Sequence, residues 1–164
     1  MVSNSVRLCS PGSSARSLLV ANFKNLDVFH KAHSLALNVI QVSVVMRGPV
    51  GLAIKGQMVR AALSVPTNIV EGSAKGSDHE FARFAYIAMG SLSELEYHLI
   101  VAKDITLVTE RDFNRLTEKL IDIRKMLTGL HRRLKSSAET PVARKQIAAS
   151  RSAGSRRRVA GRLP

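Results

Sequence analysis

The residues from Gln57 to Ala102, QMVRAALSVPTNIVEGSAKGSDHEFARFAYIAMGSLSELEYHLIVA, decide the fold of this chain. Two runs with helical periodicity meet within them at a short break rich in glycine and serine, between Gly72 and Gly76. A break of this composition between two apolar-periodic runs is typical of a connection between helices. The stretch therefore predicts one helix over residues 52–74 and a second over residues 78–103.

The first of these helices combines an apolar face with a polar stripe that continues over several turns. Pro66 lies inside the pattern and predicts a kink, because its ring removes one backbone hydrogen bond. Asn68 and Glu71 are in principle a catalytic pair, but we interpret the stripe as structural, bonding the backbone freed by Pro66 or a neighbouring helix. The apolar face uses Val59, Ala62, Leu63, Ile69 and Val70, and the polar stripe uses Gln57, Arg60, Ser64, Asn68 and Glu71.

The second helix begins at a capping box, SDHE at residues 77–80, in which the Ser77 hydroxyl can accept from the Glu80 amide. Its core face repeats at helical spacing from Phe84 to Ala102. The opposite face carries two tyrosines, an isoleucine and an arginine around a glycine, a mixture typical of protein interfaces. This face predicts an oligomer contact made by Arg83, Tyr86, Ile87, Gly90, Glu94 and Tyr97.

Two further helices flank this pair. The first is predicted over residues 26–46, with Asn25 as its cap and Gly48-Pro49 as its stop. The last begins after Thr109 and carries a heptad seam of apolar residues, typical of bundle packing: Phe113, Leu116, Leu120, Ile123, Leu127, Leu130 and Leu134. Four helices with short connections predict an all-α, antiparallel up-down-up-down four-helix bundle over residues 22–136.

The chain is strongly basic, and the charge is unevenly distributed. The net charge of +13 divides into +2 for residues 1–21, +5 for 22–136 and +6 for 137–164. We expect the first segment to be a disordered leader, although it is faintly similar to a transit peptide, and the last to be a disordered basic tail. Cys9 is the only cysteine, which excludes a disulfide scaffold or a Cys-rich zinc site. No apolar run approaches the ~20 residues that span a bilayer, so the expected location is cytoplasmic.

The central stretch resembles the bacterial four helix bundle family, also called the 23S rRNA intervening-sequence proteins. The resemblance covers residues 22–135 and leaves both tails outside. It rests on Phe23, Leu26-Asp27-Val28, Gln57, Arg60-Ala61-Ala62, Ser64, Pro66, Asn68-Ile69, Glu71-Gly72, Ser77, Glu80-Phe81, Phe84, Ile87-Ala88, Gly90-Ser91, Glu94-Leu95-Glu96-Tyr97, Leu99 and Ala102. Two departures are Val28-Phe29, where many members carry Trp or Tyr, and Ile105-Thr106, where members usually have a glycine turn.

The resemblance implies a helical bundle that assembles into a homo-oligomeric ring, often a pentamer, and most members have no known activity. A related branch is the accessory protein of diversity-generating retroelements, a basic pentamer that binds a reverse transcriptase and nucleic acid. We therefore name RNA or DNA and a reverse transcriptase, or another nucleic-acid enzyme, as the expected partners.

Local motifs for chemistry are weak. A di-metal bundle site needs two Glu-x-x-His motifs, and none occurs in the chain. Glu94 and His98 are four residues apart, but we expect them toward different sides of the core face. Residues 72–76, GSAKG, lack the strand and the ending of a phosphate-binding loop, and a helix exit explains them better. We predict no metal, no cofactor and no enzymatic activity.

The charge leaves two hypotheses open. In the first, a ring collects several basic faces and tails and binds RNA or DNA through phosphates, independently of sequence and steeply dependent on salt. In the second, the chain is a structural or protein-interaction scaffold and its charge only aids solubility. A membrane partner is not expected, because the tail has no hydrophobic anchor. The nucleic-acid hypothesis names Arg111, Arg115, Lys119, Lys125, Arg132, Arg133, Arg156, Arg157 and Arg158.

Overall fold

The structure is a computed structural model that describes residues 22–139. Within that range it contains four long α-helices, one short 3-10 helix and no strand. The elements are η1 (Phe23–Asn25), α1 (Asp27–Ser43), α2 (Gly48–Ala74), α3 (Asp78–Asp104) and α4 (Glu110–Ala138). The prediction of four helices is confirmed. The helix α4 runs two residues past the predicted domain boundary at residue 136, and the leader and most of the basic tail lie outside the described residues.

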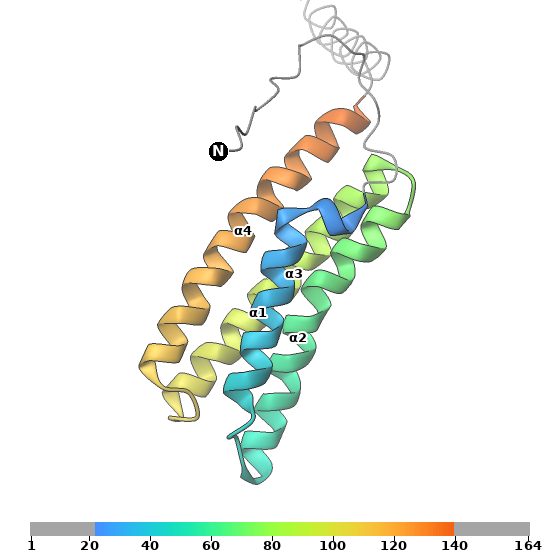
Figure 1. Cartoon of the computed structure of the whole chain (residues 1–164). Coiled ribbons are helices and arrows are strands. Elements are labelled where there is room, and N and C mark those ends of the chain that lie inside the picture. Colours follow the sequence, from blue (N-terminus) through green and yellow to red (C-terminus); the bar gives the residue numbers. More distant parts are fainter. Residues whose placement is uncertain (1–21, 140–164) are drawn as a thin grey trace, which may run out of the picture.

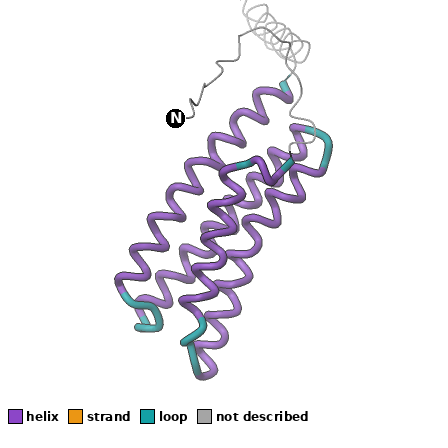
Figure 2. The backbone as a smooth tube through the Cα atoms, viewed as in Figure 1, coloured by secondary structure: helices purple, strands orange, loops and turns teal. Residues whose placement is uncertain are grey.

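The four helices lie side by side as one elongated bundle (Figure 1). The α1–α2 and α3–α4 connections lie at one end, and the α2–α3 connection lies at the other end (Figure 2). The described chain also starts and stops at the end that carries the α2–α3 connection. None of the helices in residues 22–139 is long and apolar enough to cross a membrane.

The turn between α1 and α2 differs from the prediction. The helix α1 ends at Ser43 rather than Met46, and Gly48-Pro49, predicted only as a stop, forms the first turn of α2. Proline suits this position because its missing amide would be unpaired there in any case. Gly48 has a φ of +72°, a conformation that glycine adopts without steric cost. Asn25 does not cap α1, because it belongs to η1 and the cap position of α1 is Leu26.

The predicted starts of α3 and α4 are confirmed. The Ser77 hydroxyl accepts from the Glu80 amide at 3.2 Å, and the Thr109 hydroxyl accepts from the Asp112 amide at 3.1 Å. Such caps satisfy amides that have no partner within the helix. Each cap is followed by two acidic residues in the first turn, which the helix dipole favours.

The connection between α3 and α4 contains Thr106, the one non-glycine residue with a positive φ among residues 22–139. Thr106 has a φ of +60°, in the left-handed region that disfavours β-branched residues. Its amide donates to the Lys103 carbonyl at 2.9 Å, and the Leu107 amide donates to the Ala102 carbonyl at 2.8 Å. This pair of bonds is a Schellman motif, which needs a left-handed residue just past the helix end. Thr106 is therefore a point of local strain.

The core is aliphatic and runs the length of the bundle. On α4 the seam side chains Leu116, Leu120, Ile123, Leu127 and Leu134 are buried as predicted, while Phe113 and Leu130 are half-buried. On α2 the predicted apolar face was partly wrong, because Leu63 is 44% exposed and Val59 and Val70 are only half-buried. Ala62 and Ile69 are buried as predicted, and the other buried apolar side chains of α2 are Met58, Ala61, Val65 and Pro66.

Helices α2 and α3 approach each other closely at Gly72, near their shared connection. An added Cβ at Gly72 would lie 2.5 Å from Cδ2 of Phe81 and 2.8 Å from Cβ of Phe84. Both phenylalanines are buried, so neither has open space to move into. Gly72 is therefore required by packing, whereas Pro66 is accommodated inside α2, which continues for two more turns to Ala74.

Candidate nucleic-acid interface

Charge is segregated along α4, the helix that carries most of the predicted nucleic-acid contacts. Residues 110–122 hold four acids and three cations, whereas residues 123–138 hold five cations and no acid. The acids Glu118 and Asp122 both lie in the first half. The cations of the acid-free half are Arg124, Lys125, Arg132, Arg133 and Lys135.

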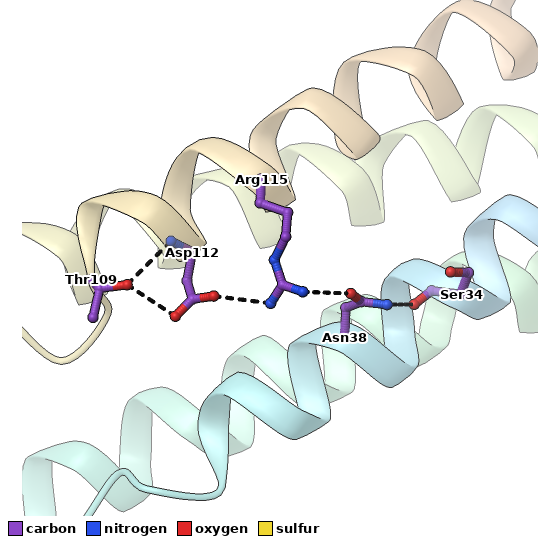
Figure 3. Close-up of polar contacts among 5 residues, drawn as sticks. All are labelled: Ser34, Asn38, Thr109, Asp112 and Arg115. Atoms are coloured by element: carbon purple, nitrogen blue, oxygen red, sulfur yellow. Dashed lines mark hydrogen bonds and ion pairs between the residues drawn. The ribbon is translucent and has the colours of Figure 1, made fainter.

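In the first half of α4, acidic and amide groups engage Arg115. Its guanidinium donates to Asp112 at 2.9 Å and to the Asn38 side-chain oxygen on α1 at 3.3 Å (Figure 3). Asn38 in turn donates to the Ser34 carbonyl at 2.6 Å, and the Thr109 hydroxyl donates to Asp112 at 2.9 Å. Arg115 is thus part of a polar chain that links the start of α4 to α1.

The seam between α1 and α4 holds Lys119. This half-buried lysine lines an open depression of about 360 Å³ together with Lys31 and Asp122, which form an ion pair at 3.7 Å. Arg111 is exposed in the first turn of α4. The three cations predicted in the first half of α4 therefore stand among acids, and their local net charge is small.

The second half of α4 brings the other predicted cations together. Lys125, Arg132 and Arg133 are exposed and have no ion-pair partner within residues 22–139. The prediction omitted Arg124, which bonds to Glu96 of α3 at 2.7 Å. It also omitted Lys135 in the last turn. Counting charge separately in each half of the helix would have identified this patch from the sequence.

The acid-free half of α4 lies toward the end of the bundle where the described chain stops, at Glu139. The predicted cations Arg156, Arg157 and Arg158 lie outside the described residues. The last described residue, Glu139, directly follows α4, and the tail continues the sequence from there. The folded patch and the basic tail are consequently neighbours in sequence, and both are positively charged.

The predicted oligomer contact on α3 faces outward. Tyr86 and Tyr97 are 66% and 62% exposed, Ile87 is 40% exposed, and an added Cβ at Gly90 would meet nothing within 4 Å. Arg83 lies over the Phe84 ring, 5.2 Å from its centroid, and forms an ion pair with Glu80 at 3.4 Å. Exposed groups of aromatic and aliphatic side chains are typical of surfaces that bind other proteins.

One residue of the polar stripe of α2, Ser64, makes a hydrogen bond to α3. The Ser64 hydroxyl lies 2.9 Å from the Ser91 hydroxyl of α3, and Asn68 donates to the Ser64 carbonyl at 2.8 Å. Arg60 donates to Gln57 one turn away. Glu71 is exposed, and Asn68 bonds to Ser64 rather than to it. Ser64 therefore links α2 to α3, whereas the bonds of Asn68 and Arg60 stay within α2.

The histidines do not converge. No group of three or more His, Cys, Asp or Glu side chains able to hold a metal comes together in the described part of the chain. His131 Nδ1 lies 2.9 Å from the Ala82 carbonyl oxygen, which ties α4 to α3. The expectation that Glu94 and His98 lie toward different sides was wrong, because His98 Nε2 lies 3.8 Å from the Glu94 carboxylate. One turn of helix is short enough for the two long side chains to meet.

Comparison with known proteins agrees with this architecture. A solved structure from Bacteroides thetaiotaomicron, described as a protein with unknown function from the S23 ribosomal protein family, is similar with a TM-score of 0.58 and 19% identity. The match covers 63% of this chain and 97% of that chain, and at this identity it shows the fold alone. A comparison with curated proteins finds no match. The family model of the 23S rRNA-intervening sequence protein matches residues 24–129, from η1 to the middle of α4. The chain belongs to the 23S rRNA-intervening sequence protein family.

Proposed function

We propose that this chain is a non-catalytic, cytoplasmic accessory protein that binds RNA or DNA through phosphates. The observation that supports it best is the acid-free half of α4, where five cations stand without an acid between residues 123 and 138. Lysine and arginine side chains bind phosphates by displacing condensed counterions, which gives affinity without base specificity. The adjoining tail adds seven basic residues against Glu139.

Assembly is the second element of the proposal. An antiparallel bundle that forms a homo-oligomeric ring would use the outward face of α3, with Tyr86, Ile87, Gly90 and Tyr97 at the contact. The exposed tyrosines and the open space at Gly90 support this assignment. A ring repeats each basic patch, so several weak phosphate contacts act on one nucleic-acid chain. The resemblance to retroelement accessory proteins adds a reverse transcriptase as the partner enzyme.

The test is direct binding of labelled RNA and DNA oligonucleotides to the full chain over a salt series. We expect measurable affinity at low salt and a linear fall of log affinity with log salt concentration. Failure to bind either nucleic acid even at low salt would overturn the nucleic-acid assignment.

The alternative function is a protein-interaction scaffold, and the exposed apolar face of α3 is the observation that favours it. Under this alternative, a chain that lacks residues 140–164 keeps its partner. Pull-down with the full and shortened chains separates the two functions, since nucleic-acid binding weakens on removal of the tail and scaffolding does not.

A further inference from the structure

Two open depressions on the second half of α4 meet at Gly129. The first, of about 440 Å³, lies against the start of α1, where residues 25–28 complete its lining. The second, of about 480 Å³, lies on the other flank of α4 and includes Arg124, which bonds to α3. Lys125 and Gly129 line both depressions, so the two are continuous across the helix.

Gly129 forms the low point between them. An added Cβ at this position would meet nothing within 4 Å, so packing inside the chain does not require glycine here. Glycine is among the least favourable residues in a helix interior, and α4 continues for nine more residues beyond it. We define the Gly129 saddle as the surface bounded by Lys125, Gly129, Arg132 and Arg133.

The Gly129 saddle is positively charged on every side. Lys125 and Arg133 are each four residues from Gly129 and Arg132 is three, so all three cations are its neighbours on the helix surface. They have no ion-pair partner among residues 22–139. Asp27 is the one acid that lines either depression. The ligand that complements this charge is an anionic chain, and the absence of a side chain at Gly129 lets that chain approach the α4 backbone closely.

We infer that a single-stranded nucleic acid crosses α4 at the Gly129 saddle, with its phosphates on Lys125, Arg132 and Arg133. This inference rests on the proposed function and adds to it the site and the kind of strand. A single strand bends over a helix and enters the depressions on both flanks, whereas a duplex is stiff over about 150 base pairs. The depressions also offer apolar surface to unpaired bases, from Met126 and Leu130 on one flank and from Ile121 on the other.

The test fills the saddle without changing its charge. Gly129→Leu adds a side chain into open space, and Gly56→Leu is its matched control, because Gly56 is also helical and an added Cβ there also meets nothing within 4 Å. The probes are a labelled single strand of mixed sequence, as RNA and as DNA, and the corresponding duplex. We expect Gly129→Leu to weaken single-strand binding about 10-fold, which is about 1.4 kcal/mol. Gly56→Leu should leave it unchanged, and the duplex should be affected little by either.

The outcomes separate the inference from the proposed function. If the wild-type chain binds no nucleic acid, both are overturned. If it binds and the charge variants at Lys125 and Arg133 weaken binding while Gly129→Leu does not, only the crossing site is overturned.

The kind of ligand is tested separately. If Gly129→Leu weakens binding of the duplex and of the single strand equally, the assignment of a single strand is overturned. An acidic polypeptide and an uncharged one are also tested as competitors. If only the acidic polypeptide displaces the single strand, and Gly129→Leu binds the strand as tightly as the wild type, the Gly129 saddle is assigned to a protein partner instead. Thermal unfolding of both variants checks that they fold, and Gly129→Ala is a smaller second variant.

Discussion

The hydroxyl oxygens of Ser64 on α2 and Ser91 on α3 lie 2.9 Å apart, although the two residues are 27 positions apart in the sequence. Ser91 also donates to the Ile87 carbonyl at 3.2 Å, and Asn68 donates to the Ser64 hydroxyl at 3.1 Å. The bonds therefore run in one direction, from Asn68 through Ser64 to Ser91 and the α3 backbone. Because Ser91 is buried, this polar chain fixes α2 and α3 in register within an otherwise aliphatic contact.

The serine pair should behave as a coupled unit. Ser91→Ala removes a buried partner of Ser64 and should lower the free energy of unfolding by about 1 kcal/mol. Ser64→Ala should do the same, and the double variant should lose less than the sum by roughly 0.5–1 kcal/mol. Urea denaturation measures all three. Ser93→Ala is the exposed control on the same helix, and strictly additive losses for the pair would show that the hydroxyls do not interact.

Gly72 should tolerate no larger residue. In Gly72→Ala the new methyl would overlap Phe81 and Phe84, so we expect a loss of roughly 1–3 kcal/mol in the free energy of unfolding. Gly56→Ala should instead stabilise the chain by up to about 1 kcal/mol, because its added methyl meets nothing and helix propensity improves. Thermal and urea unfolding of the two variants give the comparison. A stable Gly72→Ala protein would contradict the close approach of α2 to α3.

Thr106 offers a gain in stability. Thr106→Gly removes the Cβ that is strained in the left-handed conformation at the end of α3. It should therefore raise the free energy of unfolding by about 1 kcal/mol. Thr106→Ala keeps a Cβ in the same conformation, so its free energy of unfolding should stay close to that of the wild type. Chemical denaturation distinguishes the two. Destabilisation by glycine would mean that the threonine side chain has a stabilising role that outweighs the strain.

The basic patch should set the salt dependence of binding. Replacing Lys125, Arg132 and Arg133 together with alanine should weaken nucleic-acid binding and reduce the slope of log affinity against log salt by about 2, at ~0.7 per lost phosphate contact for a single strand. The control replaces Arg47, Lys55 and Lys103, three cations near the opposite end of the bundle, and has the same net charge. An equal loss in both variants would show that only total charge matters.

The outward face of α3 should control assembly. Gly90→Trp places a large ring at the centre of the proposed contact, at a position where an added Cβ meets no atom of its own chain within 4 Å. It should therefore lower the sedimentation mass without unfolding the bundle. Val45→Trp, at an exposed site in the α1–α2 connection, is the control. If Gly90→Trp sediments like the wild-type chain, this face is not the subunit contact.

Helix number, helix order and the caps at Ser77 and Thr109 were predictable, because they depend on residues within one turn of each other. The heptad seam of α4 was predictable for the same reason, since its spacing is sustained over the whole helix. The buried face of α2 was predicted only in part, because both flanks of this helix are apolar and only the neighbouring helices decide that Met58 and Ala61 are covered while Leu63 is not. The segregation of charge on α4 was present in the sequence, but the lack of ion pairs between Lys125, Arg132 or Arg133 and acids on α1 and α3 was not.

The sequence by itself determined an aliphatic, all-helical chain with a recognisable family pattern and a large basic excess, since composition and local spacing are properties of the chain alone. Only the tertiary structure decided which cations are paired. Arg115 bonds to Asp112 and Asn38, and Arg124 bonds to Glu96, whereas Lys125, Arg132 and Arg133 remain free around Gly129. The reason is physical: charge pairing acts over a few ångströms, and packing alone brings residues far apart in the chain within that distance.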